Sequence, residues 1–319
     1  MDKSRRKILK NLALGICLSP MIKIAEASEI AGLNPNSTSN FQYIYGDAAY
    51  KQEFYNFLVN VFHLFPEDKM HALIEVLTKQ NPTDKAIYTK GQDALPKIKP
   101  MFADLSYSLP ALSKQKDVIT AQTQSLLGRK KNFSGYLEIG SNGRYLDSLE
   151  EKLKIKGERY FLSEFKSSYS PVDIVDRGQI IKAGKDIDLK DYKSSLDKKI
   201  PKGSIDLATV YIGFHHCPVP LREGFITSIR DTMSDDGVLI LRDHNVHNKK
   251  MLHMVALAHD VFNMGTNMTW TYNEKELRNF YSLEDLDQMM VKFGFKSDGR
   301  KLYQSGDPTL NALMKYTKA

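Results

Sequence analysis

The chain has 319 residues, of which 42% are hydrophobic and 26% charged, and its formal net charge is +7. This composition excludes a disordered chain, and no uninterrupted apolar run approaches the roughly 18–20 residues that a membrane-spanning helix needs. Residues 1–27 carry +4 of the charge, so the rest of the chain carries only +3 and predicts no nucleic-acid-binding surface. Two cysteines, Cys17 and Cys217, cannot form a disulfide framework.

The first 27 residues have the parts of an export signal. A basic start precedes a mostly apolar stretch from Leu12 to Ile22, and Ala25-Glu26-Ala27 is a tripeptide of the kind that signal peptidase recognises. Arg5 and Arg6, followed by an apolar-apolar-Lys pattern, resemble the twin-arginine signal of proteins exported in the folded state. We therefore expect export by the twin-arginine machinery to a bacterial periplasm or beyond. The alternative is a basic amphipathic helix on a cytoplasmic protein.

Residues 28–130 predict a helical region. Helical spacing of apolar residues indicates helices in three segments, 50–65, 70–77 and 118–127. Asp47 is a candidate N-cap for the first of them. Prolines predict broken helices or loops over 91–112. None of these segments carries an obvious reactive group, so we interpret the region as a helical cap.

From Phe133 onward, short apolar strands alternate with helices, which is typical of an open, mostly parallel sheet. We predict strands near 135–139, 159–163, 205–212 and 237–242, and helices near 144–154, 221–233 and 283–293. The end of the chain predicts two further strands, 296–303 and 310–316, joined by Ser305-Gly306-Asp307-Pro308. This terminal hairpin indicates that the last strand enters the sheet antiparallel.

The turn after the first of these strands is Glu138-Ile139-Gly140-Ser141-Asn142-Gly143-Arg144. Glycines at such a turn let backbone amides approach an anionic group at a helix N-terminus. A dinucleotide-binding turn would need further glycines at Asn142 and Tyr145, which disfavours a nicotinamide-dependent reductase. The acidic-x-Gly-x-x-Gly pattern resembles the cofactor loop of class I S-adenosylmethionine-dependent methyltransferases. Asn142, which tolerates a left-handed backbone, and Arg144 replace the second and third glycines of that family.

The resemblance to these methyltransferases extends along the chain. The segment from Ser204 to His216 is similar to their fourth-strand region, which ends in paired histidines, and Val238–His244 is similar to their fifth strand. The resemblance covers about residues 133–319 and implies an α/β fold, a Rossmann-like seven-stranded methyltransferase sheet with an antiparallel last strand and an N-terminal helical cap. The domains it implies are an export signal at 1–27, a cap at 28–130 and a methyltransferase domain at 131–319, with a substrate-lid insertion at 245–282.

The same resemblance implies S-adenosyl-L-methionine as the cofactor. The residues expected to bind it are Glu138, Gly140, Asn142 and Gly143 in the turn, Glu164 after the second strand, Asp186 near the third strand, and Tyr211 on the fourth. Glu164 would accept hydrogen bonds from the ribose hydroxyls. Asp188 is an alternative to Asp186 for contact with the adenine amino group.

Methyl transfer from a sulfonium is an in-line displacement, so much of the catalysis is positioning in a dry pocket. A base is needed where the acceptor oxygen or nitrogen carries a proton. The candidate catalytic residues are His216, His244 and Asp243, because ligands bind beyond the carboxyl ends of the strands in open α/β sheets. His216 or His244 would be the base or substrate anchor. Alternatively, one histidine of the pair is structural, and Asp243 holds His244 or Arg242.

The expected acceptor is a small or lipid-like molecule bound under 90–115 and 245–282. Aromatic and methionine residues in the second segment either line an apolar pocket or pack in a core: Met251, Met254, Phe262, Met264, Met268, Trp270 and Tyr272.

Two other interpretations compete with this one, a metal site and a non-catalytic binding protein. Six of the eight histidines lie between His215 and His259, and His244-x-x-His247 is a partial chelating pair, but no metal motif is complete and no metal is predicted. The remaining alternative is an exported, non-catalytic binding protein that keeps the methyltransferase fold, since the methyl donor is made in the cytosol.

Overall fold

In the computed structural model, the described residues form one mixed sheet of seven strands in the order β3-β2-β1-β4-β5-β7-β6. These residues are 38–99, 109–164, 174, 177, 183–193 and 195–319, so the predicted export signal lies outside them. The strands are β1 (Asn132–Ile139), β2 (Lys154–Ser163), β3 (Lys185–Asp188), β4 (Ile205–Val210), β5 (Met233–His244), β6 (Phe295–Tyr303) and β7 (Asn311–Lys318). Strands β1 to β5 are parallel, and β7 lies antiparallel between β5 and β6. The predicted fold class, with its antiparallel last strand, is confirmed.

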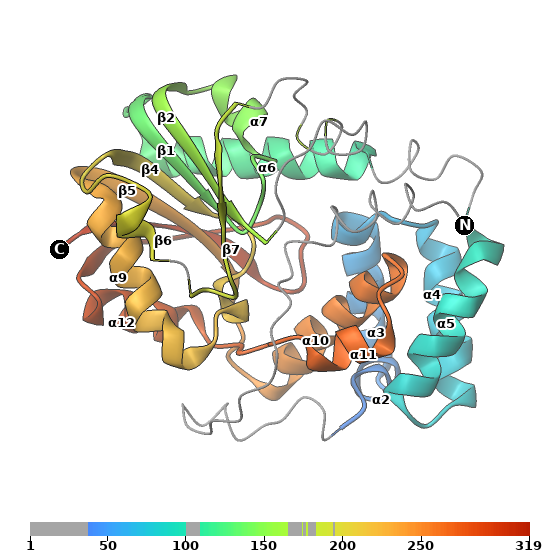
Figure 1. The fold of residues 1–319 in the computed structure, drawn as a ribbon. Helices are drawn as coiled ribbons and strands as arrows, with labels where there is room; N and C mark the ends of the chain where they lie inside the picture. The colour runs from blue at the N-terminus through green and yellow to red at the C-terminus, as the bar shows by residue number, and fades with distance from the viewer. Residues whose placement is uncertain (1–37, 100–108, 165–173, 175–176, 178–182, 194) are drawn as a thin grey trace.

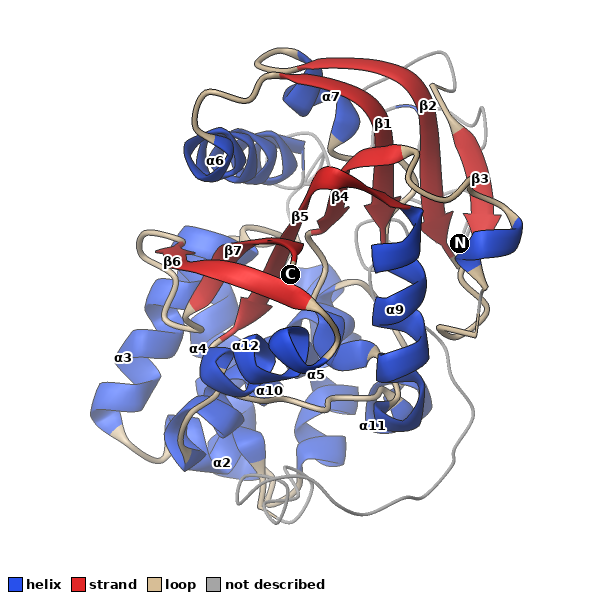
Figure 2. Cartoon of the chain, turned by 90° about the vertical axis from the view of Figure 1, so that its left-hand side faces the viewer, coloured by secondary structure: helices blue, strands red, loops and turns tan. Residues whose placement is uncertain are grey.

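Helices cover both faces of this sheet (Figure 2). On one face, α9 (Arg222–Thr232) and α12 (Leu283–Lys292) pack on residues such as Ala208 and Val210 of β4. On the other face, α6 (Leu109–Leu127) and α7 (Leu146–Glu150) pack against Leu207 and its neighbours. The alternation along β4 follows from the two-residue period of a strand, and burial on both faces explains why its sequence is almost continuously apolar.

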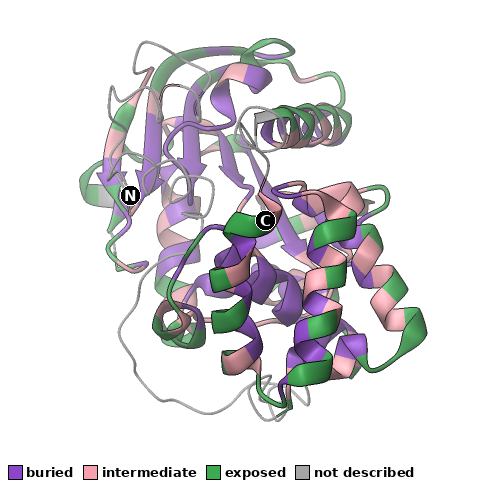
Figure 3. Ribbon diagram, turned by 90° about the vertical axis from the view of Figure 1, so that its right-hand side faces the viewer, coloured by how far each residue is buried: buried purple, intermediate pink, exposed green. Residues whose placement is uncertain are grey.

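A second body of helices lies beside the sheet (Figure 1). It contains α2 (Asn40–Tyr45), α3 (Ala48–Phe57), the π-helix η2 (Leu58–Phe62), α4 (Glu67–Gln80) and α5 (Asp84–Ile98) from the N-terminal region. It also contains α10 (Lys249–Gly265) and α11 (Trp270–Lys275) from the predicted insertion. Helix α10 is buried along most of its length (Figure 3), and it shares one apolar core with α2 to α5. The N-terminal helices up to α5 and the helices of the predicted insertion therefore fold together as one helical body.

The N-terminal helices begin where local sequence dictates. The side chains of Ser39, Asp47 and Thr83 accept hydrogen bonds from the first backbone amides of α2, α3 and α5. Such capping satisfies donors that have no partner within the helix. No described helix is long and apolar enough to cross a membrane.

Two helices differ from their predicted extent. Helix α5 continues through Pro96 to Ile98, so the prediction of broken structure over 91–112 is wrong for this part. Pro96 lacks the N–H that would donate to the carbonyl of Gln92, so it costs the last turn one hydrogen bond without ending the helix. Helix α6 begins at Leu109 rather than at 118, and it packs on the sheet rather than on α2 to α5. Residues 100–108 lie outside the described part of the chain.

Candidate active site

The turn between β1 and α7 is built around the carboxylate of Glu138. Gly140 and Gly143 have φ angles of +86° and +90°, which glycine adopts without strain. Glu138 is fully buried and accepts hydrogen bonds from the Ser141 hydroxyl and the Gly143 amide on one oxygen, and from the Tyr136 hydroxyl on the other. Burial raises the pKa of Glu138, and the two hydroxyls oppose the rise. Glu138 therefore holds the turn in shape from the inside.

The two glycines of this turn have different surroundings. A Cβ at Gly143 would lie 2.9 Å from the ring of Phe161 on β2, so this glycine is required by packing as well as by its conformation. A Cβ at Gly140 would meet only Ile212, at 3.4 Å, among the described residues within 4 Å. Asn142 is buried and is not in the left-handed conformation that its residue type tolerates. Gly140 is thus the turn residue with open space beside its backbone.

Acidic residues lie at the ends of the next two strands. Glu164 follows β2, is half-buried, and accepts a hydrogen bond from the Asp191 amide at 2.9 Å. Burial raises its pKa. Asp186 pairs with Phe161 in the middle of the sheet register, whereas Asp188 pairs with Ser163 at the carboxyl end of β2. Both aspartates are on the same face of β3, so the choice between them stays open.

The predicted catalytic residue Asp243 is the acceptor of four hydrogen bonds. One oxygen accepts from His215 Nδ1 at 2.6 Å and from the His244 amide at 2.8 Å. The other accepts from the Tyr281 hydroxyl at 2.5 Å and from the His215 amide at 3.1 Å. Burial would raise the pKa of Asp243, but the facing His215 and these donors hold it below its usual range. Asp243 positions its neighbours. The side chain of His215, and not that of His244 or Arg242, donates a hydrogen bond to it.

Four imidazoles meet next to this carboxylate. His215 and His216 follow β4, His244 ends β5, and His259 comes from α10. The ring centroid of His215 lies 4.1, 5.7 and 5.1 Å from those of His216, His244 and His259, respectively. Burial lowers the pKa of all four, to about 4 for His216. All four rings are therefore neutral near pH 7.

The Nδ1 atoms of the two predicted base candidates face backbone carbonyls. His216 Nδ1 lies 2.8 Å from the carbonyl oxygen of Leu277, and His244 Nδ1 lies 3.1 Å from that of Thr309. A neutral imidazole that donates from Nδ1 has its lone pair on Nε2. Both rings can thus accept a proton at Nε2.

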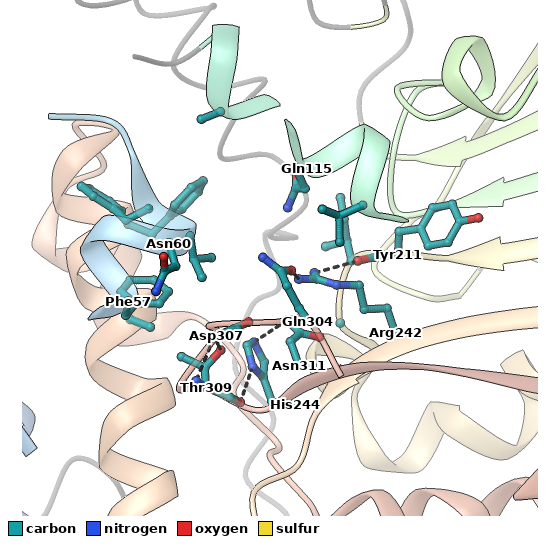
Figure 4. Close-up of a pocket in the computed structure, with 18 of the residues that line it drawn as sticks. Phe57, Asn60, Gln115, Tyr211, Arg242, His244, Gln304, Asp307, Thr309 and Asn311 are labelled. Carbon is teal, nitrogen blue, oxygen red and sulfur yellow. Dashed lines mark hydrogen bonds between the residues drawn. The ribbon is translucent and has the colours of Figure 1, made fainter. Parts of the chain in front are cut away.

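A cavity of about 510 Å³ lies between the carboxyl ends of the strands and the helical body (Figure 4). Its apolar wall comes from the end of α3, from η2 and the residues after it, and from α6 and α10. These residues are Phe57, Val61, Phe62, Leu64, Leu112, Val118, Ala258 and Phe262. Its polar wall comes mainly from the sheet side and includes Arg144, His215, His216, Arg242, His244, Gln304, Asp307 and Asn311. The size and the mixed lining suit a small organic molecule.

Tyr211 and the aromatic and methionine residues of the predicted insertion differ in how their side chains lie relative to this cavity. The Tyr211 side chain points away from the cavity centre, toward the sheet (Figure 4), and its hydroxyl lies 2.8 Å from that of Thr123 on α6. Of the aromatic and methionine residues predicted as pocket or core in the insertion, Phe262 lines the cavity, whereas Met251, Met254 and Met264 pack in the core of the helical body.

Other lining residues were not predicted as site residues. The segment 57–64 was predicted only as part of a helix, and tertiary packing brings it, including His63, to the cavity wall. It contains the π-helix η2, and such helices occur often at functional sites. The sequence predicted Arg242 only as a partner of Asp243. Because residues two apart on a strand share a face, its position two residues before His244 is the signal that places both on the cavity side.

Residues 112–298 match the family described as the methyltransferase domain, which is more than half of the chain. The chain belongs to this family. It is an S-adenosylmethionine-dependent methyltransferase, and the match begins within α6 and ends within β6. No curated protein sequence matches the chain.

Solved structures similar to the methyltransferase include those of three other methyltransferases. The Burkholderia thailandensis 1,6-didemethyltoxoflavin N1-methyltransferase is 11% identical over 66% of this chain and 79% of its own, with a TM-score of 0.43. The mitomycin 7-O-methyltransferase MmcR is 13% identical over 78% and 68%, with a TM-score of 0.44. The N,N-8-amino-8-demethyl-D-riboflavin dimethyltransferase RosA of Streptomyces davawensis is 11% identical over 66% and 56%, with a TM-score of 0.43.

The turn and strand ends of the methyltransferase fit S-adenosylmethionine. Gly140 leaves open space beside a left-handed turn, so its backbone would approach the cofactor closely. The carboxylate of Glu164, at the end of the neighbouring strand, is the type of group that accepts hydrogen bonds from a ribose. When bound, the cofactor supplies an electrophilic methyl group. Glu138 and Gly143 maintain the shape of the turn, because the Glu138 carboxylate accepts hydrogen bonds from Tyr136, Ser141 and the Gly143 amide.

Proposed function

We propose that the methyltransferase acts on a small amphipathic molecule that carries an acidic group. Arg242 is the observation that supports this substrate class. It lies two residues before the end of β5, on the polar wall of the cavity, and is only 7% exposed. Its guanidinium donates to the side chain of Gln304 at 2.9 Å and to the Tyr211 carbonyl at 3.5 Å, both neutral acceptors.

No carboxylate of the described residues lies within the 4.0 Å ion-pair distance of Arg242. Asp307 attracts it only from beyond that distance, and burial lowers the pKa of the guanidinium. A buried guanidinium with no carboxylate in direct contact is costly, so an anionic ligand that pairs with it would be stabilised. Carboxylates and phosphates match the forked donors of arginine best.

The rest of the acceptor would lie against the apolar wall. Phe57, Phe62 and Phe262 present rings from the helical body on the side opposite Arg242. Aromatic side chains bury flat or lipid-like apolar groups well and exclude water from the cavity. A dry cavity favours displacement at a methyl carbon, because water neither competes as a nucleophile nor stabilises the charged reactants.

His244 is the proposed proton acceptor for this reaction. It lies two residues after Arg242 on β5, so both side chains leave the strand on the same face and line the same cavity. Its Nδ1 faces Thr309, and its Nε2 has only a long contact of 3.4 Å with Asn311 Nδ2, which the acceptor's hydroxyl or amine would replace when Nε2 takes its proton. The acidic group at Arg242 would hold the acceptor while His244 takes that proton.

The test compares acceptors that differ only in charge. Hydroxybenzoic and hydroxycinnamic acids, and the amides of the same acids, would be offered with methyl-labelled S-adenosylmethionine. We expect the acids to be bound and methylated about 10–100-fold better than the amides, and Arg242→Gln to remove this preference. Arg230→Gln, on α9 outside the cavity, is the control. Equal use of acids and amides by the unchanged protein would contradict the proposed substrate class.

We also propose that residues 1–27 export the folded enzyme. The support is the sequence alone: Arg5-Arg6, the apolar stretch and the tripeptide ending at Ala27. A fusion of residues 1–35 to a reporter that works only after folded export should depend on the arginine pair. If the double change Arg5→Lys and Arg6→Lys exports equally well, the twin-arginine proposal is wrong.

A further inference from the structure

We propose that His215, His216 and His259 form a binding site for a divalent transition-metal ion, best suited to Zn²⁺, on the inner wall of the cavity. The inference concerns the same cavity as the proposed reaction but does not depend on the identity of the methyl acceptor.

The three imidazoles converge from two separate parts of the chain. His215 and His216 belong to the short 3₁₀ turn after β4, and His259 belongs to α10. One ring nitrogen from each lies within 4.8 Å of the other two, and all three side chains are buried but line the cavity. The ring centroid of His259 lies 5.1 Å from that of His215 and 5.3 Å from that of His216.

Hydrogen bonds at the Nδ1 atoms determine where the lone pairs point. His215 Nδ1 donates to Asp243 at 2.6 Å, and His216 Nδ1 donates to the Leu277 carbonyl at 2.8 Å. His259 Nδ1 lies 3.4 Å from the buried carboxylate of Glu276. Metal-binding histidines typically have such a carboxylate or carbonyl behind the ring, because it fixes the tautomer and raises the basicity of the other nitrogen.

The remaining nitrogens present lone pairs without donors to match them. His215 Nε2 is buried and has no hydrogen-bond partner among the described residues. Since the Nδ1 proton of each of His215 and His216 is committed elsewhere, their Nε2 atoms are acceptors only. Neighbouring lone pairs in a buried place require an electron-poor partner, and a metal ion is the partner that binds several neutral imidazoles at once.

The dimensions agree with zinc after small ring movements. Zn–N bonds of about 2.0–2.1 Å place tetrahedral nitrogens roughly 3.3 Å apart, closer than the 4.8 Å limit found here. His259 is the ring that would move to close this gap, since its Nδ1 contact with Glu276 is long, at 3.4 Å, and would shorten or shift with the ring. Burial lowers the pKa of these rings, which keeps them in the neutral form that binds metals.

The buried network behind His259 would hold such a site in place. Arg278 donates to Glu276 at 2.9 Å and to Asp260 at 2.8 Å, and Asp260 also accepts from Asn40 of α2. Three histidines with the cavity as the open side match zinc sites that keep a position for a ligand. A dication there would add positive charge to the wall that already contains Arg242.

The test measures metal uptake without any methyl acceptor. The full chain, free of a polyhistidine tag, would be stripped with a chelator and titrated with ZnCl₂ and with CoCl₂, whose visible spectrum reports tetrahedral nitrogen ligands. We expect about one equivalent bound per chain. His216→Gln and His259→Gln should each weaken binding by more than the about 10–100-fold that loss of a supporting partner costs. Both variants should retain S-adenosylhomocysteine binding, which also shows that they fold.

Two control histidines separate this site from general histidine binding. His247→Ala removes an exposed ring, the partner of His244 in the chelating pair considered from the sequence. His253→Gln removes a buried ring of α10 that faces Asn40 instead of the cluster. Both should bind the metal like the unchanged chain. The proposal is overturned if the unchanged chain takes up no Zn²⁺ or Co²⁺, or if all four variants bind equally, which would indicate water between the rings.

Discussion

His215 Nδ1 and Asp243 Oδ1 lie 2.6 Å apart in a place where both side chains are at most 2% exposed. This pair connects the turn after β4 to the end of β5, two strands that are neighbours in the sheet. Because Asp243 also accepts from Tyr281 and from two backbone amides, it has little capacity left for a ligand. Its function in the site is to set the orientation of His215.

Replacement of Asp243 with Asn should therefore destabilise the whole fold. An amide cannot accept four hydrogen bonds as a carboxylate does, and the Nδ1 proton of the buried, neutral His215 loses its charged acceptor. We expect the free energy of unfolding at pH 7 to fall by about 3 kcal/mol, as measured by urea denaturation. Asp235→Asn is the control, because Asp235 is exposed and 3.5 Å from Lys318, and should change stability by less than about 0.5 kcal/mol. Equal losses in both variants would show that Asp243 has no special role.

The fold was largely predictable because local patterns agree with the tertiary structure. The strands of the sheet alternate with amphipathic helices, and Ser282 caps α12 with the reciprocal hydrogen bonds of a capping box. The terminal hairpin placed β7 antiparallel, as expected. The continuation of α5 through Pro96 was not predictable, because a proline removes one hydrogen bond and the packing of α5 in the helical body decides whether the helix continues.

Replacement of Gly140 with Val tests the cofactor turn. With φ at +86°, a β-branched residue is strained, and its side chain would occupy the open space beside the backbone. We expect S-adenosylhomocysteine binding to be lost in calorimetric titration while the protein stays folded. Gly203→Val is matched in backbone conformation, with φ at +67° and no neighbour within 4 Å among the described residues. Full affinity in Gly140→Val would overturn the placement of the cofactor.

Glu164 is expected to contribute directly to cofactor affinity. Glu164→Gln keeps the size of the side chain but removes the charge that would accept from two ribose hydroxyls. The affinity for S-adenosylhomocysteine should fall about 10–100-fold, with little change in stability. Glu158→Gln, an exposed residue of the same strand that pairs with Lys185, should leave the affinity unchanged. If the two variants bind alike, another residue contacts the ribose.

The site itself was only partly predictable. His216 follows β4, and Asp243 and His244 are the last residues of β5, so their place at the carboxyl edge of the sheet follows from topology. His259 is far from them in sequence and reaches them only because α10 packs among the N-terminal helices. The apolar wall near Phe57 has the same cause: a stripe of apolar residues predicts a helix but not which of its side chains remain beside a cavity.

His253 should make the stability of the helical body dependent on pH. The ring is buried, stacks on Tyr43 with centroids 4.2 Å apart, and has its Nδ1 2.9 Å from the side-chain oxygen of Asn40. Burial, with a smaller effect of Lys249, lowers its pKa to about 4. The unfolded chain, with a histidine pKa of about 6.5, therefore binds a proton more readily than the folded chain does.

The sign of this effect follows directly. The stability contributed by neutral His253 is fully present above about pH 6.5 and is lost as the pH falls from there to about 4, at most about 3 kcal/mol. His253→Gln, which keeps a side-chain amide near Asn40, should flatten the decline in unfolding free energy over this range. The measurement is urea denaturation at a series of pH values, with exposed His247→Gln as the control. An unchanged pH slope in His253→Gln would show that this ring titrates alike in the folded and unfolded chains.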